Sequence, residues 1–229
     1  MLPCQSFLPH TSGCMVIVPG LFNKHLFLWI VCIEKYVMDL KVAVIYGSVR
    51  SNRQGIKAAK YLNRKLKDRG YYVDFIDPLV YQLPFLDKMY KEYEPGQAPE
   101  NIQKLADIFS AADGFLIVSG EYNHSIPPAL KNLLDHFQAE YVFKPSAIAA
   151  YSAGMFGGMR VAVHLRAVLA ELGMPAISSI QPFPRVQKSF DENGTPQNEH
   201  IEPSTNRFLS EFEWYMNALK RQREEGMPF

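Results

Sequence analysis

The sequence has few cysteines, and all of them lie near its N-terminus. Cys4, Cys14 and Cys32 are the only ones in 229 residues. From residue 33 onward the chain therefore forms no internal disulfide and contains no thiol nucleophile. This distribution fits a reducing compartment, and we expect a cytoplasmic protein.

The sequence also lacks metal-ligand spacing and an excess of either charge. The histidines beyond residue 33 are scattered, without the spacing typical of zinc ligands, so no metal site is expected. Lys and Arg number 24 against 23 Asp and Glu, for a net charge of +1. A balance of this kind does not favour nucleic acid or an anionic membrane surface as a partner.

No apolar run is long enough to cross a membrane. The longest, Leu26–Ile33, has 8 residues, whereas a spanning helix needs about 20. The first lysine is Lys24 and the first arginine is Arg50, so the start resembles neither a signal peptide nor a transit peptide. We interpret residues 1–37 as an extension, from an upstream start or a splice form, and residues 38–229 as the folded domain. A weak association of the extension with membranes is the alternative.

A hydrophobic content of 48% allows a core of ordinary size. From residue 40 onward, short apolar runs alternate with segments of helical periodicity. Strands are expected at 40–46, 71–76, 114–118, 146–151 and 174–180. Helices are expected at about 52–69, 100–111, 127–138, 157–172 and 204–223, with a proline-rich connection at 181–203. This alternation predicts an α/β fold whose parallel sheet is covered on both faces.

The loop after the first predicted strand, Gly47–Gly55, is a candidate phosphate site. It leads into a helix N-terminus, where N–H groups and the positive dipole end favour an anion. Ser48 adds a hydroxyl, and Arg50 or Arg53 can form forked hydrogen bonds to phosphate oxygens. The loop matches neither the Walker A pattern nor G-x-G-x-x-G, which disfavours ATP hydrolysis and a Rossmann-type NAD site.

The loop after the third predicted strand carries a carboxylate, a phenol, an amide and a hydroxyl, in the sequence Glu121-Tyr-Asn-His-Ser125. Pro127 and Pro128 then open a helix. Loops at the carboxyl ends of strands bind ligands in open α/β sheets. The alternative is an ordinary loop whose polar residues cap the helix. Lys131, Asn132 and Asp135 are expected to have structural roles in that helix.

The loop after the fourth predicted strand, Ser152–Gly158, consists mainly of small residues. Glycine lets a backbone approach a flat ring closely. The N–H groups of such a loop can donate to the edge of the ring. A plain glycine-rich turn into the next helix is the alternative.

These three segments together resemble the NADPH-dependent FMN reductases, a family of flavodoxin-like quinone and azo reductases. The most specific match is E-Y-N-x-S-x-P-x-x-L-K-N-x-x-D at 121–135, and the resemblance extends from about residue 39 to the last helix. It implies a flavodoxin-like, doubly wound, five-stranded parallel sheet of order 2-1-3-4-5. In this order the loops after strands one and three meet at the switch point. Periodicity alone does not select it.

The resemblance also implies FMN as a cofactor, with NADPH or NADH as the reductant. The expected cofactor-binding residues are Ser48, Arg50, Arg53, Gln54, Gly55, Glu121, Tyr122, Asn123, His124, Ser152, Gly154, Gly157 and Gly158. Hydride would pass through the flavin to a quinone, an azo compound, a flavin or a similar small acceptor. Because this chemistry belongs to the flavin, no catalytic side chain is expected.

Two other functions stay open. One is a flavodoxin-type electron carrier without NAD(P)H turnover, although carriers are usually strongly acidic. The other is an interaction protein that keeps the scaffold. Whatever the function, the apolar residues of the fourth predicted helix cover more of its circumference than the roughly 100° stripe of a simple surface helix. Relatives commonly pair through the third and fourth helices, so a homodimer is expected, with a tetramer as the alternative.

Overall fold

Five parallel strands form the centre of the computed structural model, which describes residues 39–229. The predicted extension, residues 1–37, lies outside the described residues. The strands are β1 (Lys41–Tyr46), β2 (Tyr72–Ile76), β3 (Gly114–Gly120), β4 (Ser146–Tyr151) and β5 (Ala176–Phe183). Their order is β2-β1-β3-β4-β5, which confirms the predicted topology. The chain reverses direction across the sheet between β1 and β3, so the switch point lies there.

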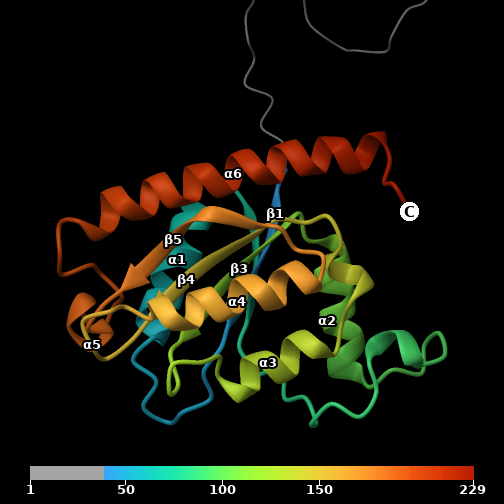
Figure 1. Cartoon of the computed structure of the whole chain (residues 1–229), viewed down its shortest axis with the longest axis horizontal. Helices are drawn as coiled ribbons and strands as arrows, with labels where there is room; N and C mark the ends of the chain where they lie inside the picture. The colour runs from blue at the N-terminus through green and yellow to red at the C-terminus, as the bar shows by residue number, and fades with distance from the viewer. Residues whose placement is uncertain (1–38) are drawn as a thin grey trace, which may run out of the picture. The chain divides into compact units, whose positions relative to one another are not determined.

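Helices cover both faces of the sheet (Figure 1). One face packs against α1 (Ile56–Asp68) and α6 (Ile201–Glu225), and the other against α2 (Glu100–Ala111), α3 (Pro128–Asp135) and α4 (Met159–Glu171). Successive strand side chains point to opposite faces. Every residue of β3 and β4 is buried, which explains why these strands read as continuous apolar runs.

Three short helices complete the described chain. Two are 3-10 turns, η1 (Tyr90–Glu92) and η2 (Ala139–Tyr141), and the third is α5 (Val186–Ser189). The α5 helix lies within the proline-rich connection at 181–203, for which no helix is predicted. None of the helices in residues 39–229 is long and apolar enough to span a membrane.

Two elements differ from their predicted bounds in ways that matter for the site. The β5 strand continues to Phe183 and so includes Pro182, because an edge strand tolerates a residue that donates no ladder hydrogen bond. The α1 helix begins at Ile56 rather than near residue 52. The preceding residues instead form a turn, in which the Ile56 and Lys57 N–H groups donate to the carbonyls of Arg53 and Gln54.

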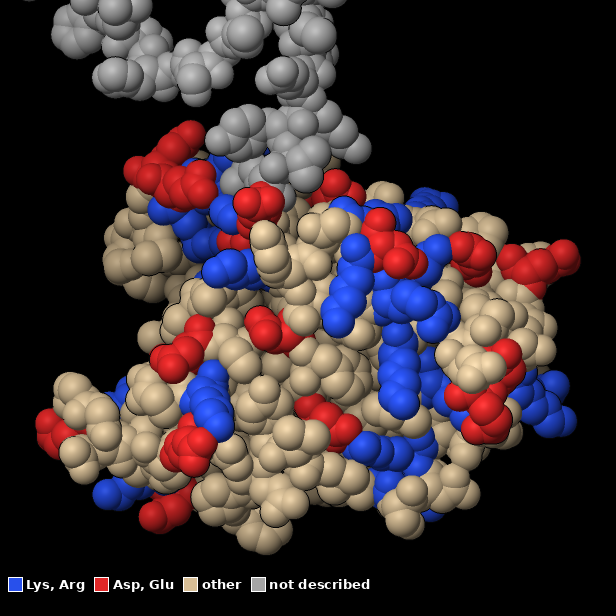
Figure 2. Space-filling view, turned by 180° about the vertical axis from the view of Figure 1, so that it is seen from behind, with Lys and Arg blue, Asp and Glu red and all other residues tan. Residues whose placement is uncertain are grey.

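Opposite charges are interspersed on the face of the domain that Figure 2 shows. In the view from behind, acidic side chains accompany a band of Lys and Arg right of centre (Figure 2). Several ion pairs tie α1 to later parts of the chain: Lys57–Glu192 at 2.6 Å, Lys65–Glu202 at 2.5 Å and Arg69–Glu213 at 3.3 Å. Each of these pairs is partly open to solvent, and ion pairs near the surface contribute only about 0–1 kcal/mol each. The buried core therefore carries most of the stability.

Candidate functional site

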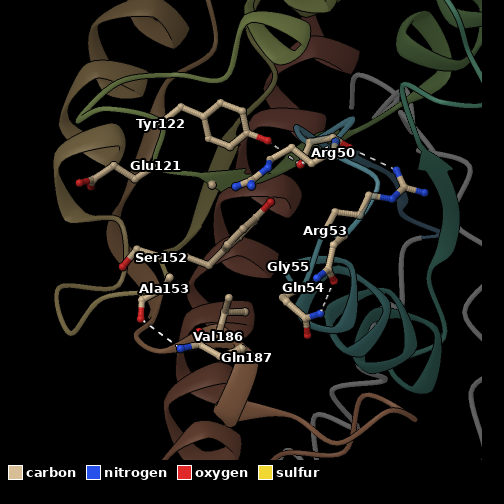
Figure 3. A pocket seen from close by; sticks show the side chains of 14 residues that line it. Arg50, Arg53, Gln54, Gly55, Glu121, Tyr122, Ser152, Ala153, Val186 and Gln187 are labelled. Carbon is tan, nitrogen blue, oxygen red and sulfur yellow. Dashed lines mark hydrogen bonds between the residues drawn. The ribbon is translucent and has the colours of Figure 1, made fainter.

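A cavity of about 340 Å³ lies at the carboxyl ends of the central strands (Figure 3). The loops after β1, β3 and β4 line it together with the start of α5. Small-molecule sites usually measure about 300–1,000 Å³. Eight of the predicted cofactor-binding residues are among its lining: Ser48, Arg50, Arg53, Gln54, Gly55, Glu121, Tyr122 and Ser152.

Two larger cavities elsewhere in the described chain lack this convergence of polar loops. One, of about 720 Å³, lies beside Lys144 and Arg223. The Lys144 ammonium group already donates to the Phe109 and Ser110 carbonyls at 2.7 Å, so it serves the end of α2. The other, of about 580 Å³, is a mainly apolar groove beside α3. Chemistry rather than volume identifies the smaller cavity as the candidate site.

The β1–α1 loop presents a run of unused backbone donors. In the part of the chain that the structure describes, no acceptor pairs with the N–H groups of residues 51 to 55. Residues 52 to 55 line the cavity, immediately before the first turn of α1. Successive N–H groups at a helix N-terminus form an anion-binding arrangement. The late start of α1 leaves these donors available.

The two arginines of this loop have different environments. The Arg53 guanidinium is bidentate to Asp77, at 2.6 and 2.7 Å, and also donates to the Ser48 carbonyl at 3.2 Å. Hydrogen bonding to Asp77 raises the pKa of Arg53. The Arg53 guanidinium points away from the cavity, whereas the Arg50 side chain extends toward Tyr122 and the centre of the cavity (Figure 3). Arg53 therefore holds the loop, and Arg50 is the cation available to an anion.

The β3–α3 loop is a tight hairpin. Tyr122 and Ser125 exchange backbone hydrogen bonds of 3.0 and 2.9 Å, with Asn123 at φ 48° and His124 at φ 68° between them. Two central residues with positive φ match the turn that suits a two-residue hairpin. Asn123 and His124 occupy the exposed tip and are absent from the cavity lining. The Tyr122 hydroxyl lies 2.7 Å from the Ser48 hydroxyl, which joins this loop to the first.

The Glu121 side chain serves α4. Its carboxylate accepts the N–H groups of Arg160 and Val161 at 3.0 and 3.4 Å, and the Arg160 guanidinium is 3.6 Å away. The carboxylate is turned away from the cavity (Figure 3). A carboxylate at this position satisfies free N–H groups and the positive end of the helix dipole. At the cavity, Glu121 presents mainly backbone.

The glycines of the β4–α4 loop shape the turn rather than line the cavity. Gly157 has φ 63° and Gly158 has φ 81°. A β-carbon at Gly158 would lie 2.8 Å from the Tyr151 backbone nitrogen, so only glycine fits there. Gly154, Gly157 and Gly158 are outside the lining, whereas Ser152 is within it.

The cavity includes six residues that sequence reasoning missed: Asn52, Gly120, Tyr151, Ala153, Val186 and Gln187. Four of these adjoin predicted residues in the three loops, so their position at the ends of strands was the available signal. Val186 and Gln187 belong to α5. This helix packs against the β4–α4 loop, because the N–H groups of Arg185 and Val186 donate to carbonyls of that loop at 2.9 and 3.1 Å. No local sequence pattern predicts this tertiary contact. No cluster of metal-ligating side chains occurs within residues 39–229.

Free N–H groups suited to a phosphate lie before α1, beside the loops after β3 and β4, which can contact a flat ring. This arrangement at the switch point is typical of the flavodoxin-like flavin-binding proteins. Comparison with known proteins agrees. The profile of the NADPH-dependent FMN reductase family matches residues 40–185. A 2-hydroxy-1,4-benzoquinone reductase of Burkholderia sp. is 32% identical over 181 residues, covering 76% of this chain and 95% of the relative. An NADPH azoreductase of Bacillus sp. (strain OY1-2) is 27% identical, covering 81% and 98%.

The fold has a counterpart among solved structures. A flavoenzyme NAD(P)H:(acceptor) oxidoreductase from Paracoccus denitrificans superposes with a TM-score of 0.63 at 23% identity, covering 78% of this chain and 98% of that one. The chain belongs to the NADPH-dependent FMN reductase family. It is an FMN-dependent NAD(P)H oxidoreductase, as the sequence motifs predicted.

Proposed function

We propose that the 340 Å³ cavity is the FMN site, with the phosphate at the start of α1. The observation that carries this proposal is the run of N–H groups at residues 51 to 55 without a protein acceptor among the described residues. Arg50 supplies the positive charge, since Arg53 is paired with Asp77. The Ser48 hydroxyl adds a donor. These groups suit a phosphate monoester.

The other two loops hold the isoalloxazine ring in this proposal. Within the described chain, the N–H group of Ala153, which lines the cavity, lacks an acceptor, as do those of residues 154 to 158, which continue the loop beyond the lining. Bound FMN supplies the hydride-transfer chemistry. N–H groups beside the ring stabilise negative charge that develops at its edge. Tyr122 offers an aromatic face at the same place.

The acceptor is a small, flat, electron-poor molecule such as a quinone or an azo compound. The names of the two relatives support this substrate class. The β4–α4 loop exposes Met155 and Phe156, 65% and 60% accessible, which offer an apolar contact for such a molecule. The cavity lining contains no histidine, and the Glu121 carboxylate faces α4. The proton that accompanies hydride transfer to the acceptor therefore comes from water or from a hydroxyl of the lining such as that of Tyr122.

The active protein is a homodimer that pairs through α4 and works in the cytoplasm. Leu130, Leu133 and Leu134 of α3 are buried within their own chain. On α4, however, Met159 and Val163 remain 41% and 62% exposed, and they continue the apolar surface of the β4–α4 loop. A second copy would cover this strip in a symmetric pair. The confinement of cysteine to the first 32 residues supports a reducing compartment.

Titration of the flavin-free protein with FMN and with riboflavin tests the site. Flavin fluorescence reports binding, and one FMN per chain is expected, bound at least about tenfold more tightly than riboflavin. Inorganic phosphate should compete with FMN but not with riboflavin. Equal affinities for the two flavins would contradict the proposed phosphate site at the start of α1.

A further inference from the structure

The short helix α5 contributes to the cavity beside the three loops. Its first two residues, Val186 and Gln187, belong to the lining, and both lie beyond residues 40–185, which the family profile matches. Val186 is 4% exposed and packs among the core residues on the α1 side of the sheet. Gln187 is exposed, so its amide is accessible to a molecule in the cavity.

Backbone contacts hold α5 in this place. Arg185, which precedes the helix, has φ 47° and ψ 49°, a left-handed conformation that a residue other than glycine adopts only at a cost. The N–H groups of Arg185 and Val186 donate to the carbonyls of Gly154 and Ser152. The surrounding structure therefore stabilises the strained turn that brings Gln187 to the cavity.

The Gln187 amide has one bond within the protein. Its Nε2 donates to the Ala153 carbonyl at 3.3 Å (Figure 3). In the described structure the second hydrogen on Nε2 and the oxygen Oε1 have no partner. A glutamine amide has two hydrogens to donate and an oxygen that accepts. Gln187 can therefore both donate to a ligand and accept from it.

Gln187 lies between the two parts of the proposed FMN site. In Figure 3 it has Ala153, in the loop proposed to hold the ring, on one side and Gln54, in the loop proposed to hold the phosphate, on the other. The ribityl chain of FMN joins the ring to the phosphate and carries hydroxyl groups. Each hydroxyl can donate and accept, which matches the free atoms of the amide.

We propose that Gln187 hydrogen-bonds to the ribityl hydroxyl groups of FMN and so holds the chain between the ring and the phosphate. The inference rests on the proposed FMN site. It gives a binding role to a residue that neither the sequence motifs nor the family profile include. Because Ala153 already orients the amide, little side-chain freedom is lost when the flavin binds.

Three flavins separate this contact from the others: FMN, riboflavin, which lacks the phosphate, and lumiflavin, which also lacks the ribityl chain. In Gln187→Ala the dissociation constants of FMN and riboflavin should rise by the same factor, about three- to tenfold, as expected for a hydrogen bond between neutral groups. The dissociation constant of lumiflavin should stay within about twofold. Fluorescence titration of the flavin-free proteins provides the readout.

Gln197→Ala is the matched control. The Gln197 amide also donates to a nearby carbonyl, that of Thr195 at 3.2 Å, but from an exposed position outside the cavity lining. Its removal should leave the dissociation constants of all three flavins within about twofold of those of the parent protein.

Three results would overturn the inference while the parent protein still binds FMN. Unchanged riboflavin affinity in Gln187→Ala, with or without a loss for FMN, would mean that the amide contacts no ribityl hydroxyl. A loss for lumiflavin as large as that for riboflavin would mean that the substitution disturbs the cavity as a whole. Equal losses in Gln197→Ala would mean that the effect is not specific to the cavity. A parent protein that binds no FMN would instead overturn the FMN site itself.

Discussion

Charge at the candidate site depends on which arginine has a partner. Arg53 is held by Asp77, so Arg50 should supply most of the side-chain attraction for a phosphate. Arg50→Ala should weaken FMN binding by about 1.5–3 kcal/mol, or roughly tenfold or more. Riboflavin, which lacks the phosphate, should be nearly unaffected in the same fluorescence titration.

Lys60→Ala is the control for Arg50→Ala, because it removes the same charge from an exposed position on α1 outside the cavity lining. It should leave FMN affinity within about twofold, since exposed charges are screened by salt. A loss for riboflavin as large as that for FMN in Arg50→Ala would show that the substitution disturbs the loop instead.

At the residue scale, the type of a side chain and its place after a strand predicted which loops form the cavity. They did not predict which way each side chain points. Ser48, Arg50 and Tyr122 line the cavity as expected, whereas Asn123 and His124 occupy the exposed tip of a hairpin. Their positive φ angles arise from a two-residue turn that the motif did not reveal. The contribution of each predicted residue to FMN binding stays a prediction.

At the scale of the element, α4 depends on an acid from another loop. Its first turn contains no acidic residue, and Glu121 accepts two of its N–H groups. Glu121→Gln should lower the free energy of unfolding by about 1 kcal/mol, because the helix loses a charge at its positive end. Urea unfolding measures the change.

Glu171→Gln is a control at the opposite end of α4, where Glu171 is exposed. An acid there faces the negative end of the dipole, so its removal should be neutral or slightly stabilising. The role assigned to Glu121 would be wrong if the two substitutions shifted the urea midpoint equally.

Elements with purely local or fully buried signals were predicted best. The bounds of α2 and β4 match the predicted 100–111 and 146–151, because apolar patterns and flanking polar residues define them. The end of β5 depends on its place at the sheet edge, and α5 depends on docking against the β4–α4 loop. Such tertiary effects leave no periodic signal in the segment itself. The strand order likewise came from family resemblance, since periodicity fits several orders.

At the scale of the whole molecule, the proposed dimer can be broken at one exposed position. Val163 is 62% exposed on α4, so a charge there should not disturb the fold of the single chain. Val163→Glu should convert a dimer of about twice 26.1 kDa into a monomer. Light scattering on a size-exclusion column reports the mass. Val163→Thr, which adds no charge, should stay dimeric, and a parent protein of 26.1 kDa with full flavin occupancy would contradict the dimer.

The extension is expected to be dispensable for the domain. Residues 1–37 show no periodicity continuous with the predicted fold. A variant beginning at Met38 should therefore have an unchanged melting temperature and FMN affinity. A fall of several degrees, or weaker FMN binding, would assign the extension a part in the domain.

Reductase activity is tested most directly by the colour of the protein under anaerobic conditions. The FMN-loaded protein should be yellow, bleach on addition of NADPH, and regain its colour with one equivalent of 1,4-benzoquinone. A yellow protein that NADPH does not bleach would be an electron carrier. A protein that takes up no FMN would contradict the account altogether.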